Sequence, residues 1–244
     1  MTELDHTDPR TLVSLGCRVL DLMGQSDLAW GHVSVRDPDG RGVWIKARGV
    51  GFDEVTPADV VLVDRAGRVL EGTGGVHAEY PIHTEVLAAR PDVTAVVHTH
   101  AEAAVAFSAT DLELRPLGHE GALFSPPPPP RFTATTNLVT TPELGAAVAE
   151  TLGDHRALLL VNHGIVTVGE DLPSAVLAAG FIEKACRVQL TAAATGRPLC
   201  WSPDEEARAK RASVFSPAQI AGAWRYLVRR LTSTSPPTPM VEPG

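Results

Sequence analysis

Two histidines separated by one residue end an apolar segment of the chain. The segment VTAVVHTH closes on His98 and His100, and its valines predict a buried strand. Residues i and i+2 of a strand lie on the same face, so both imidazoles would project together at the strand end. Such a pair can bind one cation. The alternative interpretation is a pair of surface histidines, or one buried and one exposed histidine.

Two further segments place metal-binding or acid–base side chains near predicted turns. Glu79 and His83 are four residues apart in a predicted helix and would share one helix face. His163 follows an apolar strand and precedes a glycine that permits a tight turn. Taken alone, His83 is typical of a core histidine and His163 of a turn histidine. Three imidazoles and one carboxylate together form a set suited to Zn²⁺, Mn²⁺, Fe²⁺ or Co²⁺.

The composition narrows the class of protein. The 244 residues carry a formal net charge of −8 without a run of Lys or Arg, which argues against nucleic acid or an anionic membrane surface as a partner. The three cysteines are far apart and form no sulfur-ligated zinc motif. No apolar run reaches the length of a membrane helix, and the first ten residues do not resemble a signal peptide. We therefore expect a cytoplasmic protein.

Helical and strand patterns alternate along the chain. Apolar spacing predicts helices over 11–23, 79–89, 101–108, 141–152, 172–194 and 217–230, and strands over 32–35, 42–46, 60–63, 93–98, 157–161 and 165–168. This alternation predicts an α/β fold with a mixed sheet and helices on its faces. We expect one domain over residues 1–231, and a disordered tail over 232–244, which is rich in Ser, Thr and Pro.

Four segments resemble the class II aldolase/adducin family. They are GHVSVR at 31–36, EYPIH at 79–83, AVVHTH at 95–100 and LLVNHG at 159–164, in the order and at the distances found in that family. The resemblance extends from about residue 11 to residue 195. It implies a single-domain α/β/α fold with a central, largely antiparallel mixed sheet. It also implies a homotetramer with sites at subunit interfaces.

The resemblance further implies roles for individual residues. His98, His100 and His163 match the three metal histidines of the family, which would hold one divalent ion per subunit. Glu79 matches the acidic residue that ligates the metal in the empty site or acts as acid/base. The family's C-terminal segment can supply an aromatic residue to a neighbouring site, and Tyr226 is the candidate here, although ordinary packing is its simpler interpretation.

The sequence departs from the phosphosugar members of the family. Those members carry Gly-Asn where this chain has Gly31-His32, and two serines where it has His77-Ala78. Their phosphate loop contains Thr-Gly, whereas 46–49 reads Lys-Ala-Arg-Gly here. A mid-chain tyrosine of the aldolases is replaced by the stretch Gly-His-Glu-Gly at 118–121. At the positions where the phosphosugar members have hydroxyl groups that bind phosphate, this chain thus has histidines and cationic side chains.

These replacements favour a carboxylate substrate rather than a sugar phosphate. His32, Arg48 and His77 are candidates to bind the carboxylate, since Arg grips such a group with two hydrogen bonds. The alternative for Arg48 is a solvated loop residue. Besides Glu79, His119 and Glu120 are candidates to deliver a proton. The altered pattern resembles the branch of the family that contains decarboxylases of hydroxylated aromatic carboxylic acids.

The sequence therefore predicts a divalent-metal-dependent carbon–carbon lyase. The favoured reaction is decarboxylation of a hydroxylated, aromatic or similar acid, because a cation can stabilise the electron pair left on carbon. One alternative is an aldolase acting on a non-phosphorylated hydroxy-keto acid. Two less favoured alternatives are a non-haem iron oxygenase and a non-catalytic scaffold like the adducin head. The exact substrate and the physiological metal are left open by the sequence.

Overall fold

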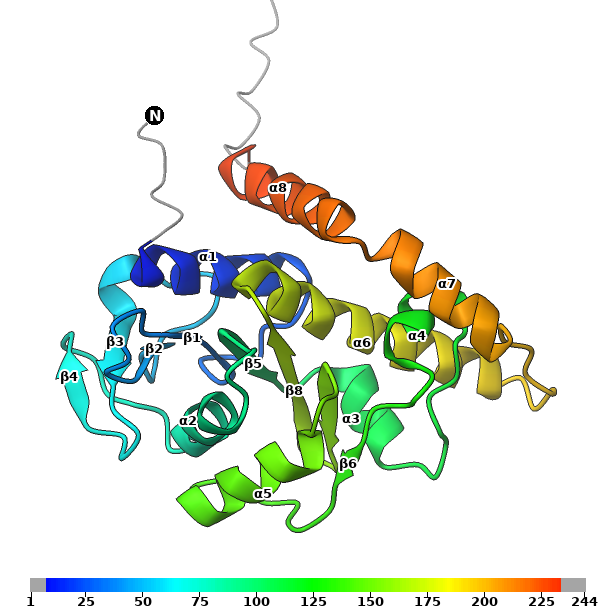
Figure 1. Ribbon diagram of the computed structural model, residues 1–244, viewed down its shortest axis with the longest axis horizontal. Helices are drawn as coiled ribbons and strands as arrows, with labels where there is room; N and C mark the ends of the chain where they lie inside the picture. The colour runs from blue at the N-terminus through cyan, green and yellow to red at the C-terminus, as the bar shows by residue number, and fades with distance from the viewer. Residues whose placement is uncertain (1–7, 234–244) are drawn as a thin grey trace, which may run out of the picture.

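The computed structural model describes residues 8–233, which form one α/β sandwich (Figure 1). Its strands are β1 (His32–Arg36), β2 (Val43–Lys46), β3 (Val60–Val63), β4 (Val69–Glu71), β5 (Ala95–Thr99), β6 (Arg131–Phe132), β7 (Ala157–Leu160) and β8 (Gly164–Gly169). Its helices are α1 (Pro9–Leu22), α2 (Tyr80–Ala89), α3 (Glu102–Ser108), α4 (Gly118–Phe124), α5 (Pro142–Leu152), α6 (Leu172–Ala193), α7 (Asp204–Val214) and α8 (Pro217–Ser233), with a 3₁₀ turn at Pro57–Asp59.

All the strands of the described chain belong to one sheet. Their order is β4-β3-β2-β1-β5-β8-β7-β6, and every neighbouring pair is antiparallel except β6 and β7. β5 lies near the centre, between β1 and β8. In this register His32 of β1 is opposite His98 of β5. The predicted class of fold, an α/β/α sandwich around a largely antiparallel mixed sheet, is confirmed.

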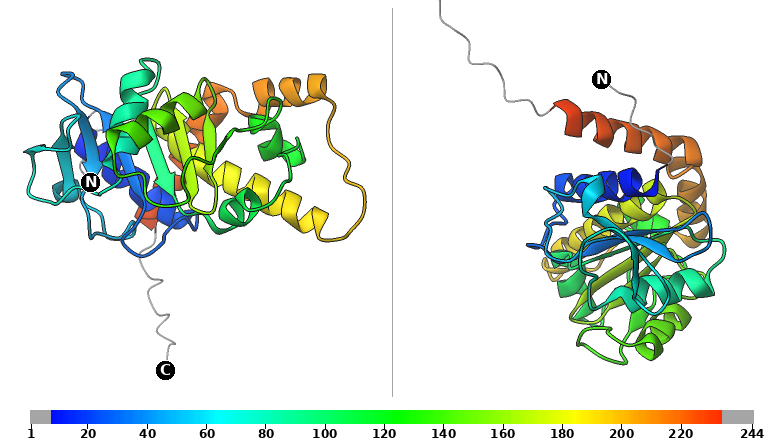
Figure 2. Two further views of the ribbon diagram at one scale, coloured as in Figure 1. Left: turned by 90° about the horizontal axis from the view of Figure 1, so that it is seen from below. Right: turned by 90° about the vertical axis from the view of Figure 1, so that its left-hand side faces the viewer.

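Helices cover both faces of the sheet (Figures 1 and 2). The helices α1, α3, α6 and α8 pack on one face with Val97 of β5, whereas α2 and α5 pack on the other face with Val96. Adjacent residues of a strand point to opposite faces, so His98 lies on the same face as Val96. The side chain of His98 therefore points toward the layer formed by α2 and α5.

Several helices begin at a side-chain cap followed closely by proline. Asp8 caps α1 and Thr141 caps α5, and in both cases proline is the first helical residue. Asp171 accepts a hydrogen bond from Ser174 N at the start of α6. A cap accepts a backbone N–H that the helix leaves unpaired, and proline has none to lose at the first position. These local signals explain why the predicted starts of these helices agree with the structure to within two residues.

The structure corrects the prediction at short or polar elements. β4, β6, α4 and α7 were not predicted. β4 and β6 contain three and two residues, too few for an alternating pattern, and α7 is mostly exposed and polar. The last helix extends to Ser233, two residues beyond the predicted domain end, and residues 234–244 of the predicted tail lie outside the described residues. No helix within residues 8–233 is long and apolar enough to cross a membrane.

The start of α2 differs from the prediction in a way that matters for the site. The helix begins at Tyr80, and Glu79 is the residue that precedes it, with φ −92° and ψ 22°. Glu79 therefore lies just before the helix rather than within it. Glu79 points toward the end of β5, whereas His83 is enclosed between α2 and β1.

Candidate metal centre

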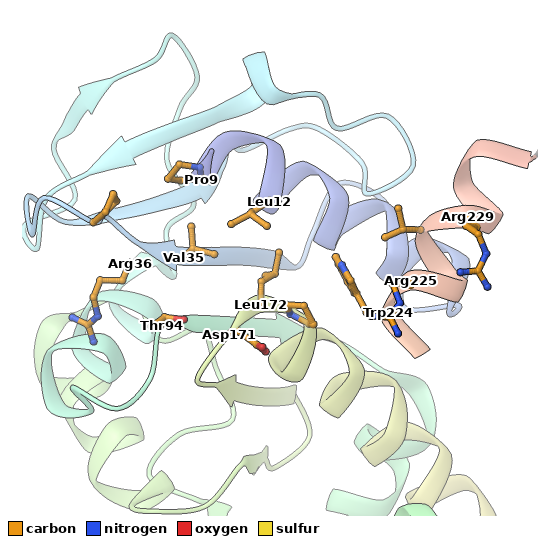
Figure 3. Close-up of a pocket in the computed structure, with 13 residues that line it drawn as sticks. Pro9, Leu12, Val35, Arg36, Thr94, Asp171, Leu172, Trp224, Arg225 and Arg229 are labelled. Carbon is orange, nitrogen blue, oxygen red and sulfur yellow. The ribbon is translucent and has the colours of Figure 1, made fainter. Parts of the chain in front are cut away.

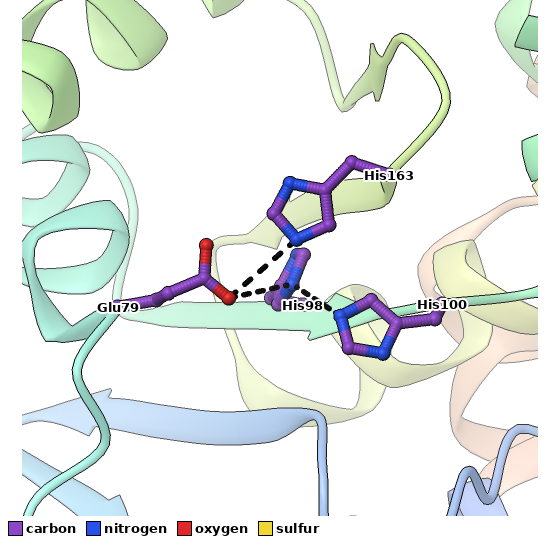
Figure 4. A group of neighbouring side chains, drawn as sticks. All are labelled: Glu79, His98, His100 and His163. Carbon is purple, nitrogen blue, oxygen red and sulfur yellow. Dashed lines mark hydrogen bonds and ion pairs between the residues drawn. The ribbon is translucent and has the colours of Figure 1, made fainter. Parts of the chain in front are cut away.

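Three histidines and one glutamate meet at the end of β5 (Figure 4). His98 lies within the strand, His100 follows its last residue, His163 lies in the turn between β7 and β8, and Glu79 precedes α2. The Nε2 atoms of His98 and His100 are 3.2 Å apart. Glu79 Oε2 lies 3.7 Å from His98 Nε2 and 3.5 Å from His163 Nε2. One ligand atom from each residue falls within 4.8 Å of all the others.

The turn between β7 and β8 brings His163 to this position. Asn162 has a φ of 58°, in the left-handed region that favours Asn and Gly. A Cβ atom on Gly164 would lie 2.3 Å from the carbonyl oxygen of Thr99, so only glycine permits β8 to start so close to β5. The pairing of Thr99 with Ile165 then places the turn beside the end of β5. The close approach of two backbones therefore requires Gly164, and the left-handed turn favours Asn162.

Hydrogen bonds fix the orientation of the ligand candidates. His98 Nδ1 donates to the carbonyl oxygen of Ile165 and His100 Nδ1 donates to Asp27 Oδ2, each at 2.9 Å. The backbone N–H of Val139 donates to Glu79 Oε1 at 2.7 Å. Metal-binding histidines typically donate their second ring nitrogen to a carbonyl or a carboxylate in this way. Neither Asp27 nor Val139 was predicted, because nothing in the local sequence of either residue indicates its partner.

The donor set fits a cation on its own chemistry. Because the Nδ1 atoms of His98 and His100 donate to fixed acceptors, their Nε2 atoms face each other in the cluster, 3.2 Å apart. His163 Nε2 is buried and has no hydrogen-bond partner among residues 8–233, since its contact with Glu79 lacks hydrogen-bond geometry. A buried nitrogen without a partner is unfavourable in the protein interior. A divalent ion bound by these converging Nε2 atoms would remove this cost.

Burial and neighbouring charges keep His98 and Glu79 in the protonation states that binding of a cation requires. Burial lowers the pKa of His98 well below its ordinary value, although Glu79 partly opposes this shift. Burial by itself raises the pKa of Glu79, but the proximity of His163 and His98 outweighs burial and lowers the pKa to about 2. At neutral pH the buried cluster therefore contains a neutral His98 and an ionised Glu79.

The cluster opens into a pocket of about 620 Å³. The predicted substrate-binding residues His32, Arg48 and His77 line this pocket. Glu79, His100 and His163 of the cluster line it too. Trp30 and Leu138, which are 56% and 50% exposed, add apolar surface at its rim. The other lining residues are Asp27, Ala29, Gly31, Gly49, Ala78 and Asn162. The pocket thus combines the candidate metal-binding cluster with the guanidinium of Arg48 and apolar surface.

A larger pocket of about 770 Å³ lies elsewhere, between α1, β1, α6 and α8 (Figure 3). Leu12, Leu172 and Trp224 form much of its wall. The described residues that line it include no histidine or cysteine, and its one carboxylate, Asp171, already caps α6. Pocket size by itself does not indicate chemistry. We therefore assign the candidate site to the smaller pocket that contains the histidines.

Three predicted residues lie outside the pocket of their own chain. His119 and Glu120 belong to α4, which packs on α6 and α7, and Glu120 forms an ion pair with Lys184 at 2.7 Å. Tyr226 lies on α8 and is 53% exposed. The structure does not bring these side chains to the cluster. The role of Tyr226 at a neighbouring subunit stays a prediction.

Buried Lys46 also supports the pocket and was not recognised from the sequence as a structural residue. Its ammonium group donates to the carbonyl oxygens of Ala29 at 3.1 Å and Val50 at 2.6 Å, and burial lowers its pKa. These bonds tie together the two loops that carry Trp30 and Arg48. Burial, followed by the positive charge of Lys46, lowers the pKa of His77 to about 4. The sequence signal that could have indicated this role was the position of Lys46 at the end of an apolar strand.

The comparisons with known proteins agree with this architecture. The chain belongs to the family described as the class II aldolase and adducin N-terminal domain, whose model matches residues 12–190. The chain is 31% identical to a 3,4-dihydroxyphthalate decarboxylase from Arthrobacter keyseri over 248 residues, which cover 94% of this chain and 96% of the relative. It is 38% identical to decarboxylase NovR from Streptomyces niveus over 171 residues, which cover 69% of this chain and 63% of that longer protein.

A solved structure shows the same fold in a carbon–carbon lyase. The L-fuculose 1-phosphate aldolase from Glaciozyma antarctica PI12 superposes with a TM-score of 0.79 at 25% identity, covering 92% of this chain and 89% of the aldolase. The aligned part of decarboxylase NovR is less than two thirds of that protein, so these comparisons show the family and the fold of the chain.

Proposed function

We propose that the chain is a decarboxylase of a hydroxylated aromatic carboxylic acid. The observation that supports this most directly is the convergence of histidine Nε2 atoms on one side of a pocket that has Arg48, His32 and His77 on its walls. A cation and an anion-binding wall within one pocket suit a substrate with both a hydroxyl and a carboxylate. The decarboxylase names of two relatives support the same reaction.

The pocket walls favour a flat, anionic molecule. Arg48 can donate two parallel hydrogen bonds to a carboxylate, and Trp30 and Leu138 offer apolar surface for a ring. The positions of the hydroxyl-rich phosphate cradle predicted for sugar-phosphate relatives hold histidine, alanine and arginine here. This wall chemistry supports an aromatic carboxylate over a sugar phosphate.

In the proposed mechanism, His98, His100 and His163 would hold one divalent ion, with Glu79 beside it. Such an ion supplies positive charge that stabilises an electron pair developing next to an oxygen. Asp27 and the Ile165 carbonyl keep two of the imidazoles in their binding orientation. Arg48 and His32 would orient the carboxylate. Glu79, ionised in the free protein, would accept the proton of a substrate hydroxyl and return it to the carbon that loses CO₂.

The reaction is tested by measuring which product leaves. Protein loaded separately with Zn²⁺, Mn²⁺, Fe²⁺ or Co²⁺ is mixed with 3,4-dihydroxyphthalate and a panel of hydroxybenzoates, and CO₂, aldehydes and O₂ are followed. We expect metal-dependent release of one CO₂ per substrate consumed, without O₂ uptake. Release of an aldehyde from a hydroxy-keto acid without CO₂ would support the aldolase alternative. Uptake of O₂ with iron would support an oxygenase, and absence of any metal affinity would support a scaffold.

Replacing Arg48 with alanine is expected to weaken substrate binding. Loss of a charge-assisted hydrogen bond should raise KM about 10-fold or more, with a smaller change in kcat. Steady-state kinetics on the substrate found in the screen measure this effect. Arg18→Ala, on the exposed side of α1, is the control. A KM equal to that of the parent would identify Arg48 as a solvated loop residue.

We further propose that residues 1–231 act as one domain within a homotetramer. In such an assembly Tyr226 of one chain would approach the site of a neighbour; it is exposed on α8 and does not line the pocket of its own chain. Light scattering of the purified protein measures the subunit number.

A further inference from the structure

A row of three buried polar side chains lies behind the pocket. Ser34 Oγ is 2.7 Å from His83 Nδ1, and His83 Nε2 is 2.7 Å from His32 Nδ1. Ser34 and His83 have no exposed surface, and His32 is 3% exposed where it lines the pocket. Ser34 and His32 are two residues apart on β1 and point to the same face, while His83 comes from α2. The row therefore connects the interior of the protein to the pocket wall.

The hydroxyl group of Ser34 sets the direction of the hydrogen bonds in this row. Among the described residues, His83 is the one recorded hydrogen-bond partner of Ser34 Oγ. A buried hydroxyl hydrogen without an acceptor is unfavourable, so Ser34 donates to His83 Nδ1. Burial lowers the pKa of His83 to about 3, which keeps its ring neutral. A neutral ring that accepts at Nδ1 carries its proton on Nε2, and His83 therefore donates to His32.

The same reasoning applies to His32. Its Nδ1 accepts from His83, so a neutral His32 carries its proton on Nε2, the nitrogen that the row leaves unpaired. His77, the other pocket histidine near it, is oriented differently, because its Nε2 donates to the carbonyl oxygen of Ala47 at 3.2 Å. Backbone geometry thus orients His77, whereas side chains from two elements orient His32.

We propose that Ser34 and His83 are positioning residues that fix His32 as a hydrogen-bond donor toward the pocket. His32 would then donate from Nε2 to an anionic oxygen of the substrate, and it could not accept a hydrogen bond there. The identity of that oxygen as a carboxylate rests on the proposed function. The proton order in the row rests on the buried contacts and on the neutral His83 ring, and it does not depend on the identity of the ligand.

A neutron structure of the zinc-loaded protein, exchanged into D₂O, tests the proton order directly. We expect deuterium on Nε2 of both His83 and His32 and on the hydroxyl of Ser34, with Nδ1 of both rings bare. Deuterium on His32 Nδ1 would overturn the inference. This measurement does not depend on turnover or on knowledge of the substrate.

Variants test the consequence for binding, with phthalate as an unreactive dicarboxylate probe. Ser34→Ala and His83→Leu are expected to raise the Kd for phthalate about 3- to 10-fold, the typical effect of one lost hydrogen bond. For the substrate found in the screen, KM should rise similarly while kcat stays within about twofold of the parent. His83→Gln should bind nearly as the parent does, because its amide can accept from Ser34 and donate to His32.

Two controls separate positioning from a loss of packing. Ser14→Ala removes another buried serine hydroxyl, which bonds to the carbonyl of Thr11 on α1, and should leave the Kd unchanged. The double variant Ser34→Ala/His83→Leu should bind phthalate with the same Kd as His83→Leu alone, because Ser34 acts on His32 through His83. Parent-like phthalate binding by Ser34→Ala would overturn the inference.

The outcomes also separate this inference from the proposed function. Deuterium on His32 Nε2 without CO₂ release from any acid in the panel would retain the row and reject the decarboxylase. CO₂ release with deuterium on His32 Nδ1 would retain the decarboxylase and reject the row.

Discussion

Replacing His98 with alanine is expected to remove both bound metal and turnover. His98 is fully buried in β5, and its Nε2 lies between His100 and Glu79. Loss of a residue that merely orients a metal ligand typically costs about 10- to 100-fold in affinity or activity. Loss of a ligand at the centre of the cluster should exceed that range. The remaining His100 and His163 would form an incomplete site.

Metal content by mass spectrometry, a Zn²⁺ titration and kcat/KM measure this effect. His155→Ala is the matched control, because His155 lies in the loop before β7, where its backbone carbonyl rather than its side chain contacts Arg90. The control should keep the metal and the activity of the parent. Full turnover by His98→Ala, or by parent protein stripped of metal with a chelator, would rule out the proposed mechanism.

Replacing Glu79 with glutamine is expected to preserve much of the metal binding and to lower kcat about 10²- to 10⁴-fold, the usual contribution of general acid–base catalysis. Glutamine has nearly the same size, and its carbonyl oxygen can still accept the hydrogen bond from Val139 N–H. It cannot accept and return a proton at neutral pH. The change therefore separates the charge and proton transfer of Glu79 from its role in packing.

The control for this variant is Glu85→Gln on α2. Glu85 is also a buried carboxylate, but it forms an ion pair with Arg65 and does not line the pocket. Its replacement should leave kcat unchanged. Unchanged kinetics for Glu79→Gln would exclude Glu79 from proton transfer. A parallel loss of metal and activity would instead assign Glu79 as a ligand.

The sequence by itself determined the features that depend on neighbours within a few residues. The alternation of β5 placed His98 and His100 on one side of the strand, and their Nε2 atoms indeed lie 3.2 Å apart. Apolar residues also predicted the long helix α6 and the strands β7 and β8, because strands buried on both faces consist of continuous apolar runs. Order and spacing of four motifs identified the family and, with it, the sandwich fold.

The tertiary structure decided which distant residues meet. His163 reaches His98 only because β8 pairs with β5, and Asp27 reaches His100 across 73 positions of the chain. From the sequence, Glu79, His119 and Glu120 were all candidate proton donors. In the structure α4, which carries His119 and Glu120, packs against α6 and does not line the pocket of its own chain. Local patterns report the secondary structure that a segment prefers. Contacts between segments depend on how the whole chain buries its apolar faces, and no single stretch of sequence specifies that arrangement.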